Sequence, residues 1–109
     1  GDAQAQHRVA IMCQNGLGMV ANPLMAYKWM HAAAEQGYAM AEHGLGFMYL
    51  YGECTEKNEK EAAKWFRNAA EHGLTGSAMT LGMMYEQGLG VEKNEAEAKK
   101  WYERAEPKA

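Results

Sequence analysis

Apolar and polar positions follow the period of an α-helix through the middle third of the chain. Over residues 40–51 the apolar side chains fall at i, i+4, i+7 and i+8 on one face, at Ala41, Leu45, Met48 and Tyr49. This spacing is typical of an amphipathic helix with one buried face. The apolar stripe of a second predicted helix comprises Ala62, Trp65, Phe66, Ala69 and Ala70. The other face of that second helix is charged and is predicted to be solvated.

Asparagines at matching places mark the predicted starts of the second helices. The side chain of Asn58 can accept a hydrogen bond from an unpaired backbone N–H of the first turn, and Glu61 three residues later would complete a reciprocal capping box. Asn94 repeats this arrangement, and Asn22 is followed by Pro23, a favoured first residue of a helix. Acidic residues near these starts are explained by the helix dipole rather than by a cation site.

Glycines at matching places are predicted to end the helices. Gly16, Gly52 and Gly88 fall where a first helix should stop, because the residue after a helix often needs a positive φ that glycine adopts without strain. Gly37 and Gly73 end the second helices in the same way, and the next helix begins at once. Connections this short make neighbouring helices antiparallel.

The whole pattern repeats at a fixed interval. Trp29, Trp65 and Trp101 lie 36 residues apart, since 65 − 29 and 101 − 65 both equal 36. A period of this size indicates a solenoid of stacked units. We therefore predict an all-α fold, an α/α solenoid of three helix-turn-helix repeats with six helices in a single domain. The predicted extents are 1–109 for the domain and about 3–38, 39–74 and 75–109 for the repeats.

The first and last repeats depart from the middle one. Val9 and Ala10 stand where the other repeats have leucine and glycine, and Pro107 cannot continue the last helix. Neither end has an additional polar helix, although the terminal repeats of a solenoid normally need a capping face. Two alternatives stay open: further repeats belong at these ends, or the ends associate with other copies, which would make the chain a self-assembling structural element.

Composition and charge exclude several classes of function. The chain of 109 residues has a formal net charge of −3, and its Lys and Arg alternate with Glu, so it lacks the basic face that nucleic acids require. No apolar run is long enough for a membrane span, and no leader segment follows Gly1, as expected of a processed or cloned fragment. Neither nucleic acid nor membrane insertion is expected.

The two cysteines occupy different places in their repeats. Free thiols are therefore expected, and a disulfide between Cys13 and Cys54 is the alternative. Cys13 stands where other repeats have tyrosine and is predicted to be a small buried side chain. Cys54 stands where Gly18 and Gly90 lie, so a left-handed backbone there would strain it by about 1 kcal/mol. A reactive, exposed thiol at Cys54 is a further hypothesis.

At these residues the chain resembles the Sel-one-like repeat family, a branch of the tetratricopeptide superfamily. The family's unit reads A-x-x-x-L-G-x-x-Y-x-x-G-x-G-V, then an Asn or Asp cap, A-x-x-W-F and A-A-x-x-G. The matching residues are Ala41, Leu45, Gly46, Tyr49, Gly52, Asn58, Ala62, Trp65, Phe66, Ala69, Ala70 and Gly73, and then Leu81, Gly82, Tyr85, Gly88, Gly90, Val91, Asn94, Ala98 and Trp101.

The resemblance implies a right-handed superhelix in which the first helices line a concave groove. It also implies a non-enzymatic adaptor that brings proteins together, since no catalytic motif and no cofactor belong to the family pattern. A bacterial protein that is periplasmic or secreted is the setting it favours. A cysteine-rich bacterial branch is described as binding or hydrolysing β-lactams, so a hydrolase or binder of such cell-wall compounds is the alternative function. The chain lacks the paired cysteines of that branch.

The side of the first helices opposite the leucine stripe is the predicted binding groove. Its apolar character would suit an apolar or amphipathic protein or peptide segment, bound as a helix in a groove. The alternative is that these side chains are core and pack on neighbouring helices. The residues predicted to line the groove are Ile11, His43, Phe47, Leu50, Tyr51, Met79, Met83 and Glu86, with Met40 beside them.

Histidine and serine offer little catalytic or metal-binding chemistry. His7 and His43 share a repeat position, but helices in contact lie about 8–10 Å apart, too far for two imidazoles to bind one zinc ion at about 2 Å without bending inwards. No metal is therefore expected. His31 and His72 lie at unmatched places and are predicted to be solvated. Ser77 is a poor nucleophile candidate because no lysine follows it at S-x-x-K spacing.

Overall fold

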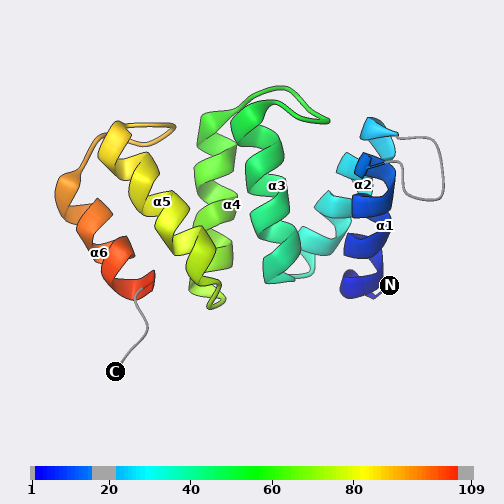
Figure 1. Ribbon diagram of the computed structural model, residues 1–109, viewed down its shortest axis with the longest axis horizontal. Coiled ribbons are helices and arrows are strands. Elements are labelled where there is room, and N and C mark those ends of the chain that lie inside the picture. Colours follow the sequence, from blue (N-terminus) through cyan, green and yellow to red (C-terminus); the bar gives the residue numbers. More distant parts are fainter. Residues whose placement is uncertain (1, 16–21, 106–109) are drawn as a thin grey trace.

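The computed structural model describes residues 2–15 and 22–105, which form six α-helices in three antiparallel pairs (Figure 1). The helices are α1 (Ala3–Asn15), α2 (Pro23–Glu35), α3 (Ala39–Tyr51), α4 (Glu59–Glu71), α5 (Thr75–Gln87) and α6 (Glu95–Ala105). We refer to the pairs α1/α2, α3/α4 and α5/α6 as units one, two and three. The units follow one another along the long axis of the molecule, and no strand occurs in the described ranges. The predicted all-α helical repeat fold is confirmed.

The predicted asparagine caps are confirmed at all three second helices. Each Oδ1 atom accepts a hydrogen bond from a backbone N–H in the first turn, at 3.2 Å for Asn22 and Asn58 and 3.1 Å for Asn94. Pro23 follows Asn22 as the first residue of α2. Each cap satisfies one of the donors that the start of a helix leaves unpaired.

The prediction that Glu61 completes a capping box with Asn58 is wrong. The backbone N–H of Asn58, which the box would pair with Glu61, donates instead to the carbonyl oxygen of Tyr49 at 2.8 Å. Unit three repeats this bond between Asn94 and Tyr85 at 2.9 Å. In units two and three the cap residue therefore also closes the loop, because it ties the start of the second helix to the end of the first.

The helix-ending glycines have the predicted left-handed backbone. Gly52 and Gly88 follow α3 and α5 with φ of 70° and 71°, and Gly37 and Gly73 lie between units with φ of 81° and 96°. Gly16 lies outside the described residues. These turns reverse the chain without a Cβ clash, so successive helices run antiparallel as predicted.

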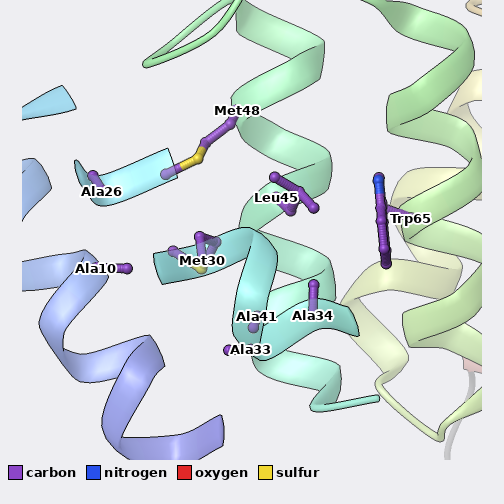
Figure 2. Packing of buried hydrophobic residues seen from close by; sticks show 9 residues of the cluster. All are labelled: Ala10, Ala26, Met30, Ala33, Ala34, Ala41, Leu45, Met48 and Trp65. Carbon is purple, nitrogen blue, oxygen red and sulfur yellow. The ribbon is translucent and has the colours of Figure 1, made fainter. Parts of the chain in front are cut away.

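Two apolar clusters form the seams between neighbouring units. The first seam joins units one and two (Figure 2) and comprises Ala10, Ala26, Met30, Ala33, Ala34, Ala41, Leu45, Met48 and Trp65. The second joins units two and three and comprises Leu50, Ala62, Ala63, Phe66, Ala70, Ala78, Leu81, Met84 and Trp101. The apolar stripes predicted for the middle unit are thus largely buried. Alanines let the backbones approach, while methionine and aromatic side chains fill the space between them.

In each unit a small residue on the first helix lies opposite a large residue on the second helix, and the sizes of the two are related, which we call the size rule. The pairs are Ala10 with Met30, Gly46 with Phe66 and Gly82 with Tyr102. A Cβ on Gly46 would lie 2.9 Å from the Phe66 ring, and one on Gly82 would lie 2.9 Å from the Tyr102 ring. Glycine is therefore present where a rigid ring fills the gap, and alanine where a flexible methionine does.

The last helix ends at Ala105, and Pro107 lies outside the described residues. None of the six helices is both long enough and apolar enough to cross a membrane.

Candidate functional site

The exposed sides of α3 and α5, which we call the first-helix face, present apolar side chains. Tyr51, Met79 and Met40 are 65%, 57% and 47% exposed. The two helices carry only two charged side chains, Glu42, which is buried, and Glu86 near the end of α5. Most of the first-helix face is therefore both apolar and uncharged.

Phe47 and Met83 are half-buried between this face and the core. The Phe47 ring stacks on Tyr51 with centroids 5.7 Å apart and an interplanar angle of 10°, and it meets Phe66 edge-on at 5.0 Å. Met83 likewise packs against the second cluster. The sequence analysis offered two roles for these residues, lining the groove or packing in the core. Both roles apply, because one side of each side chain packs in the core and the other side faces outwards.

Two residues predicted to line the groove lie elsewhere, whereas Ile11 is half-buried like Phe47 and Met83, which hold the same repeat position. Leu50 is 5% exposed and belongs to the second cluster, so it is a core residue that unit three covers and not a surface contact. Glu86 is exposed but lines a hollow of about 420 Å³ at the unit-three end, beside Tyr102. Burial, and then the charge and hydrogen bond of Glu86, raise the pKa of Tyr102. Ile11 is partly buried against the first cluster.

His43 joins α3 to α5 rather than pointing freely outwards. Its Nδ1 atom lies 2.6 Å from Oγ of Ser77, and its ring meets Phe47 and Phe66 edge-on at 4.7 and 5.5 Å. Burial lowers the pKa of His43, which favours the neutral imidazole. Ser77 is 0% exposed. This contact therefore satisfies a buried hydroxyl and does not present a nucleophile to a substrate.

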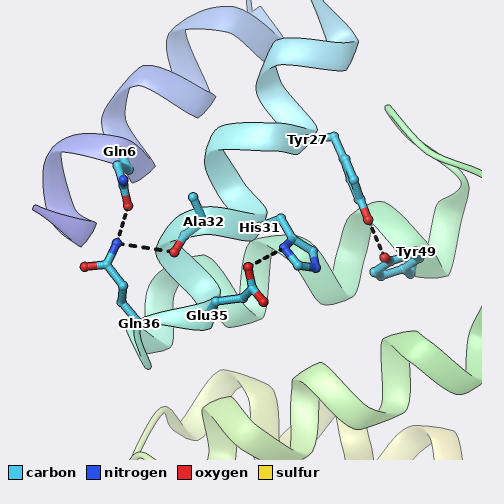
Figure 3. A network of polar contacts seen from close by, with 7 residues as sticks. All are labelled: Gln6, Tyr27, His31, Ala32, Glu35, Gln36 and Tyr49. Atoms are coloured by element: carbon cyan, nitrogen blue, oxygen red, sulfur yellow. Dashed lines mark hydrogen bonds and ion pairs between the residues drawn. The ribbon is translucent and has the colours of Figure 1, made fainter. Parts of the chain in front are cut away.

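His72 is exposed, as predicted, but its side chain also has a buried partner. Its Nδ1 atom lies 2.7 Å from Oε1 of Glu42, a carboxylate that is only 3% exposed. Unit one holds Gln6 and Gln36 at the same two repeat positions, and their side chains are also hydrogen-bonded (Figure 3). A polar pair thus ties the start of the first helix to the end of the second in units one and two. The shared repeat positions are the sequence signal that points to this pair.

His31 is half-buried rather than simply solvated, and it also has partners. Its Nδ1 atom lies 3.1 Å from Oε1 of Glu35 (Figure 3), and its ring meets Trp65 of unit two edge-on at 5.8 Å. At the same repeat position Arg67 lies over the Tyr85 ring of unit three, 5.9 Å from its centroid. Side chains at this position therefore contact an aromatic ring of the following unit.

His7 shares no site with His43. It packs edge-on against Tyr38 with centroids 5.4 Å apart, and burial lowers its pKa. Among the described residues, no three His, Cys, Asp or Glu side chains gather closely enough to hold a metal ion.

Cys54 has the left-handed backbone that its place in the repeat predicts, with φ of 67°. It is a free thiol, partly buried against the first cluster. Burial, and then the charge of Glu53, raise the pKa of this thiol, which disfavours a reactive thiolate. The side chain of Cys13 lies outside the described residues, so the sequence-based interpretation of that cysteine stays a prediction.

The outer side of α2 carries a hollow that the sequence analysis missed. It has a volume of about 590 Å³, and Leu24, at its edge, is 74% exposed. Tyr27 also lines it and reaches unit two, where its hydroxyl lies 2.6 Å from that of Tyr49 (Figure 3). At the places of Leu24 and Lys28, α4 has Lys60 and Lys64. Leu24 thus replaces the lysine found at this place in α4, and this loss of a charge is the sequence feature that could have indicated the hollow.

Sequence comparison assigns the repeats to a known family model. A model described as the Sel1 repeat matches the chain three times, over residues 3–38, 39–74 and 77–106. No match was found among curated proteins.

Solved structures with the same fold include two bacterial proteins of more than 30% identity. A Sel1 repeat protein from Oxalobacter formigenes is 39% identical with a TM-score of 0.92, over 95% of this chain and 43% of that one. A protective antigen present in uropathogenic Escherichia coli strains, which displays an SLR fold, is 36% identical with a TM-score of 0.94, over 96% of this chain and 22% of that one. The chain thus spans less than half the length of either protein.

A third structure shows the fold alone. Cysteine rich protein B of Helicobacter pylori is 24% identical with a TM-score of 0.78, over 94% of this chain and 79% of that one.

Proposed function

Because the chain belongs to the Sel1 repeat family, we propose that it is a scaffold that binds a protein or peptide segment on its first-helix face. Sel1 repeat proteins commonly mediate interactions between proteins and are generally non-catalytic. The observation that carries the proposal is the exposed, uncharged apolar surface around Tyr51 and Met79.

The chemistry of this face suits the apolar side of an amphipathic helix. Tyr51 is held by its stack on Phe47, so its ring is presented without a large loss of side-chain freedom on binding. Met40 and Met79 are flexible and polarizable and can adapt to side chains of different shape. Each square ångström of apolar surface removed from water contributes roughly 25 cal/mol.

Electrostatics support the same class of partner. His43 lies beside Phe47 on this face, and its lowered pKa favours the uncharged ring at neutral pH. A partner with charged groups along its contact side would lose their hydration here without gaining an ion pair. We therefore expect selection for segments with apolar residues at i, i+3 or i+4 and i+7.

The test removes two exposed anchors together, with Tyr51→Ser and Met79→Ser in one chain. Peptides are first selected from a display library with the wild-type protein, and their dissociation constants are then measured by fluorescence anisotropy. Loss of two anchors of this kind should weaken binding about tenfold or more, which corresponds to about 1.4 kcal/mol.

The matched control is Leu24→Ser, which removes a side chain that is 74% exposed on α2. It should leave the affinity unchanged, and circular dichroism should show the same helix content in all variants. If Leu24→Ser abolishes binding while the double variant binds normally, the site lies on the outer side of α2 and the proposal is wrong.

A further inference from the structure

A further hollow, which we call the first-seam hollow, lies where unit one turns into unit two. It has a volume of about 420 Å³ and opens between the end of α2, the start of α3 and the second half of α4. The residues that line it are Ala34, Glu35, Gly37, Glu42, Trp65, Asn68 and His72. Two of these residues are acidic and none is a lysine or an arginine. A cationic group would therefore complement the charge of this hollow.

Glu42 places a buried carboxylate at the first-seam hollow. The residue is only 3% exposed, and its Oε1 atom lies 2.7 Å from Nδ1 of His72. Among the described residues, its other oxygen, Oε2, has no hydrogen-bond partner. Burying a carboxylate oxygen without a donor is unfavourable, so this atom favours a ligand that brings N–H groups.

The second seam has a smaller hollow at the matching place, and there the chain supplies the cation itself. This second-seam hollow has a volume of about 160 Å³, and Arg104 and Glu71 both line it. The Cζ atom of Arg104 lies 4.4 Å from the centroid of the Trp101 ring. At such a distance a guanidinium group is attracted to the face of an indole ring. The second seam thus shows which group suits this place.

Unit two keeps the tryptophan of this arrangement but lacks the arginine. Asn68 holds the place of Arg104, and Trp65 holds that of Trp101, since 104 − 68 and 101 − 65 both equal 36. The Trp65 ring projects from α4 towards Ala34 of α2 (Figure 2), and both residues line the hollow. Asparagine is too short and carries no charge, so the first-seam hollow lacks the guanidinium that the second one contains.

The other differences between the two hollows also favour a cation from outside. Glu42 stands where unit three has Ala78, so the first-seam hollow gains a carboxylate as it loses the arginine. Lys64, next to Trp65 in the chain, does not replace the missing group. Its Nζ atom lies 5.6 Å from the centroid of the Trp65 ring, and Lys64 is not among the residues that line the hollow.

We propose that the first-seam hollow binds the guanidinium group of an arginine side chain from a partner protein. The guanidinium lies over the Trp65 ring, as Arg104 lies over Trp101, and donates hydrogen bonds to Oε2 of Glu42. Arginine suits the site because its planar fork of N–H donors stacks on aromatic rings and pairs with carboxylates. The hollow shares no lining residue with the exposed anchors Tyr51 and Met79, so the inference goes beyond the proposed function and does not rest on it.

The experiment titrates isotope-labelled protein with N-acetylargininamide, a blocked arginine without other charges. Heteronuclear NMR follows the indole N–H signal of Trp65, which is assigned by its loss in Trp65→Phe. This signal should shift saturably, and the shifts of Trp29 and Trp101 should be smaller. N-acetylcitrullinamide, which has a similar shape but no charge, should bind about tenfold more weakly or worse.

The key variant is Asn68→Arg, which builds the unit-three arrangement into unit two. It should weaken binding of N-acetylargininamide about tenfold or more, because the protein's own guanidinium competes for the Trp65 ring. Asn68→Gln is the matched control: it lengthens the side chain without adding charge and should bind the probe like wild type. Glu42→Gln keeps an oxygen that can accept a hydrogen bond from His72 but removes the charge, so it should also weaken binding. Circular dichroism should show the same helix content in all variants.

Equal affinity for the arginine and citrulline probes would mean that the hollow does not recognise the charge, and the proposal would be wrong. Wild-type affinity in Asn68→Arg would place the probe elsewhere on the protein and would also overturn it. The double variant with Tyr51→Ser and Met79→Ser should bind the probe normally. If it does not, the guanidinium binds on the first-helix face and not in the first-seam hollow.

Discussion

Cys54 and Gly90 hold matching places in successive loops, and both have a left-handed backbone, with φ of 67° and 71°. A Cβ on Gly90 would lie 2.1 Å from the carbonyl oxygen of Glu59, so only glycine fits there. Cys54 keeps a Cβ in the same conformation and packs its thiol against the first cluster. Position 54 in the loop of unit two therefore combines backbone strain with a small apolar contact, whereas Gly90 at the matching place in unit three has neither.

The strain at Cys54 predicts a reversal of the usual order of alanine and glycine. Cys54→Ala keeps the Cβ and loses the sulfur contact, while Cys54→Gly loses both but relieves the left-handed strain. We expect the glycine variant to be more stable than the alanine variant by about 1 kcal/mol in urea unfolding. The control is the neighbouring Thr55, which has no positive φ, and there alanine should be the more stable. Equal stability of the two Cys54 variants would show that the loop relaxes without strain.

His43 predicts a dependence of stability on pH. Its pKa in the native protein is lowered from 6.5 by burial, so the unfolded chain takes up a proton first as the pH falls. Its contribution to stability is therefore complete above pH 6.5 and is lost as the pH falls from there through the native pKa. His7 acts in the same direction, because burial lowers its pKa too.

The measurement is the free energy of unfolding in urea from about pH 7.5 to about pH 5. His43→Gln removes the titrating ring and keeps groups that can hydrogen-bond to Ser77, so the decline should be shallower than in wild type. The variant with both His43→Gln and His7→Gln should be shallower still. An unchanged slope in His43→Gln would mean that other groups carry the acid sensitivity.

Within a unit, the two helices meet through the pair formed by Gly46 and Phe66. Gly46→Ala raises helix propensity but drives a Cβ to 2.9 Å from the ring, and we expect a net loss of about 1–3 kcal/mol. Phe66→Met alone removes buried ring contacts and also destabilises. The two changes together rebuild the Ala10 and Met30 combination of unit one, so the double variant should be more stable than the sum of the single effects.

The control for this cycle is Gly44→Ala on the same helix. A Cβ there would lie 3.0 Å from the Sδ and Cε atoms of Met30, the flexible end of a side chain that can move aside. Gly44→Ala should therefore destabilise less than Gly46→Ala in the same urea unfolding assay. Strict additivity of Gly46→Ala and Phe66→Met would mean that the size rule across the three units has no energetic basis.

Local features of the helices could be predicted from the sequence, because they depend on residues close together in the chain. The cap at Asn58 and the turns at Gly52 and Gly73 each involve one chain segment and a known backbone requirement. The repeat interval then carried these predictions from one unit to the next. The capping box was wrong because the carbonyl of Tyr49, from the preceding helix, takes the N–H that Glu61 would have bound.

The candidate binding surface was harder to predict, because it depends on how the units stack. A helical wheel places Leu50 and Phe47 on one side of α3, but unit three covers Leu50 and leaves Phe47 half open. The contacts of His43 with Ser77 and of His72 with Glu42 join different helices, and nothing in the spacing along a single helix encodes them. Tyr51 and Met79 were also predicted to line the groove, and both side chains are exposed in the structure.

At the scale of the whole molecule, stability follows the order of the units along the solenoid. Unit two is packed on both sides, through the first and second clusters, while the described chain covers units one and three on one side each. In such a quasi-one-dimensional array the total stability is close to a sum of unit and seam contributions, and units can open from the ends. Each seam should therefore control the opening of the terminal unit beyond it.

Leu45 and Leu81 test this, since they hold the same place on the sides of units two and three that pack against the preceding unit, and both are 0% exposed. Each Leu→Ala change leaves a cavity in one seam and should weaken it by about 2–5 kcal/mol. In native-state hydrogen exchange, Leu45→Ala should speed exchange in α1 and α2 more than in α5 and α6, and Leu81→Ala should do the reverse. Amides of α3 and α4 should remain the slowest in both variants. Equal acceleration of all six helices by either change would instead mean that the three units unfold as one cooperative body, in which case neither seam opens independently.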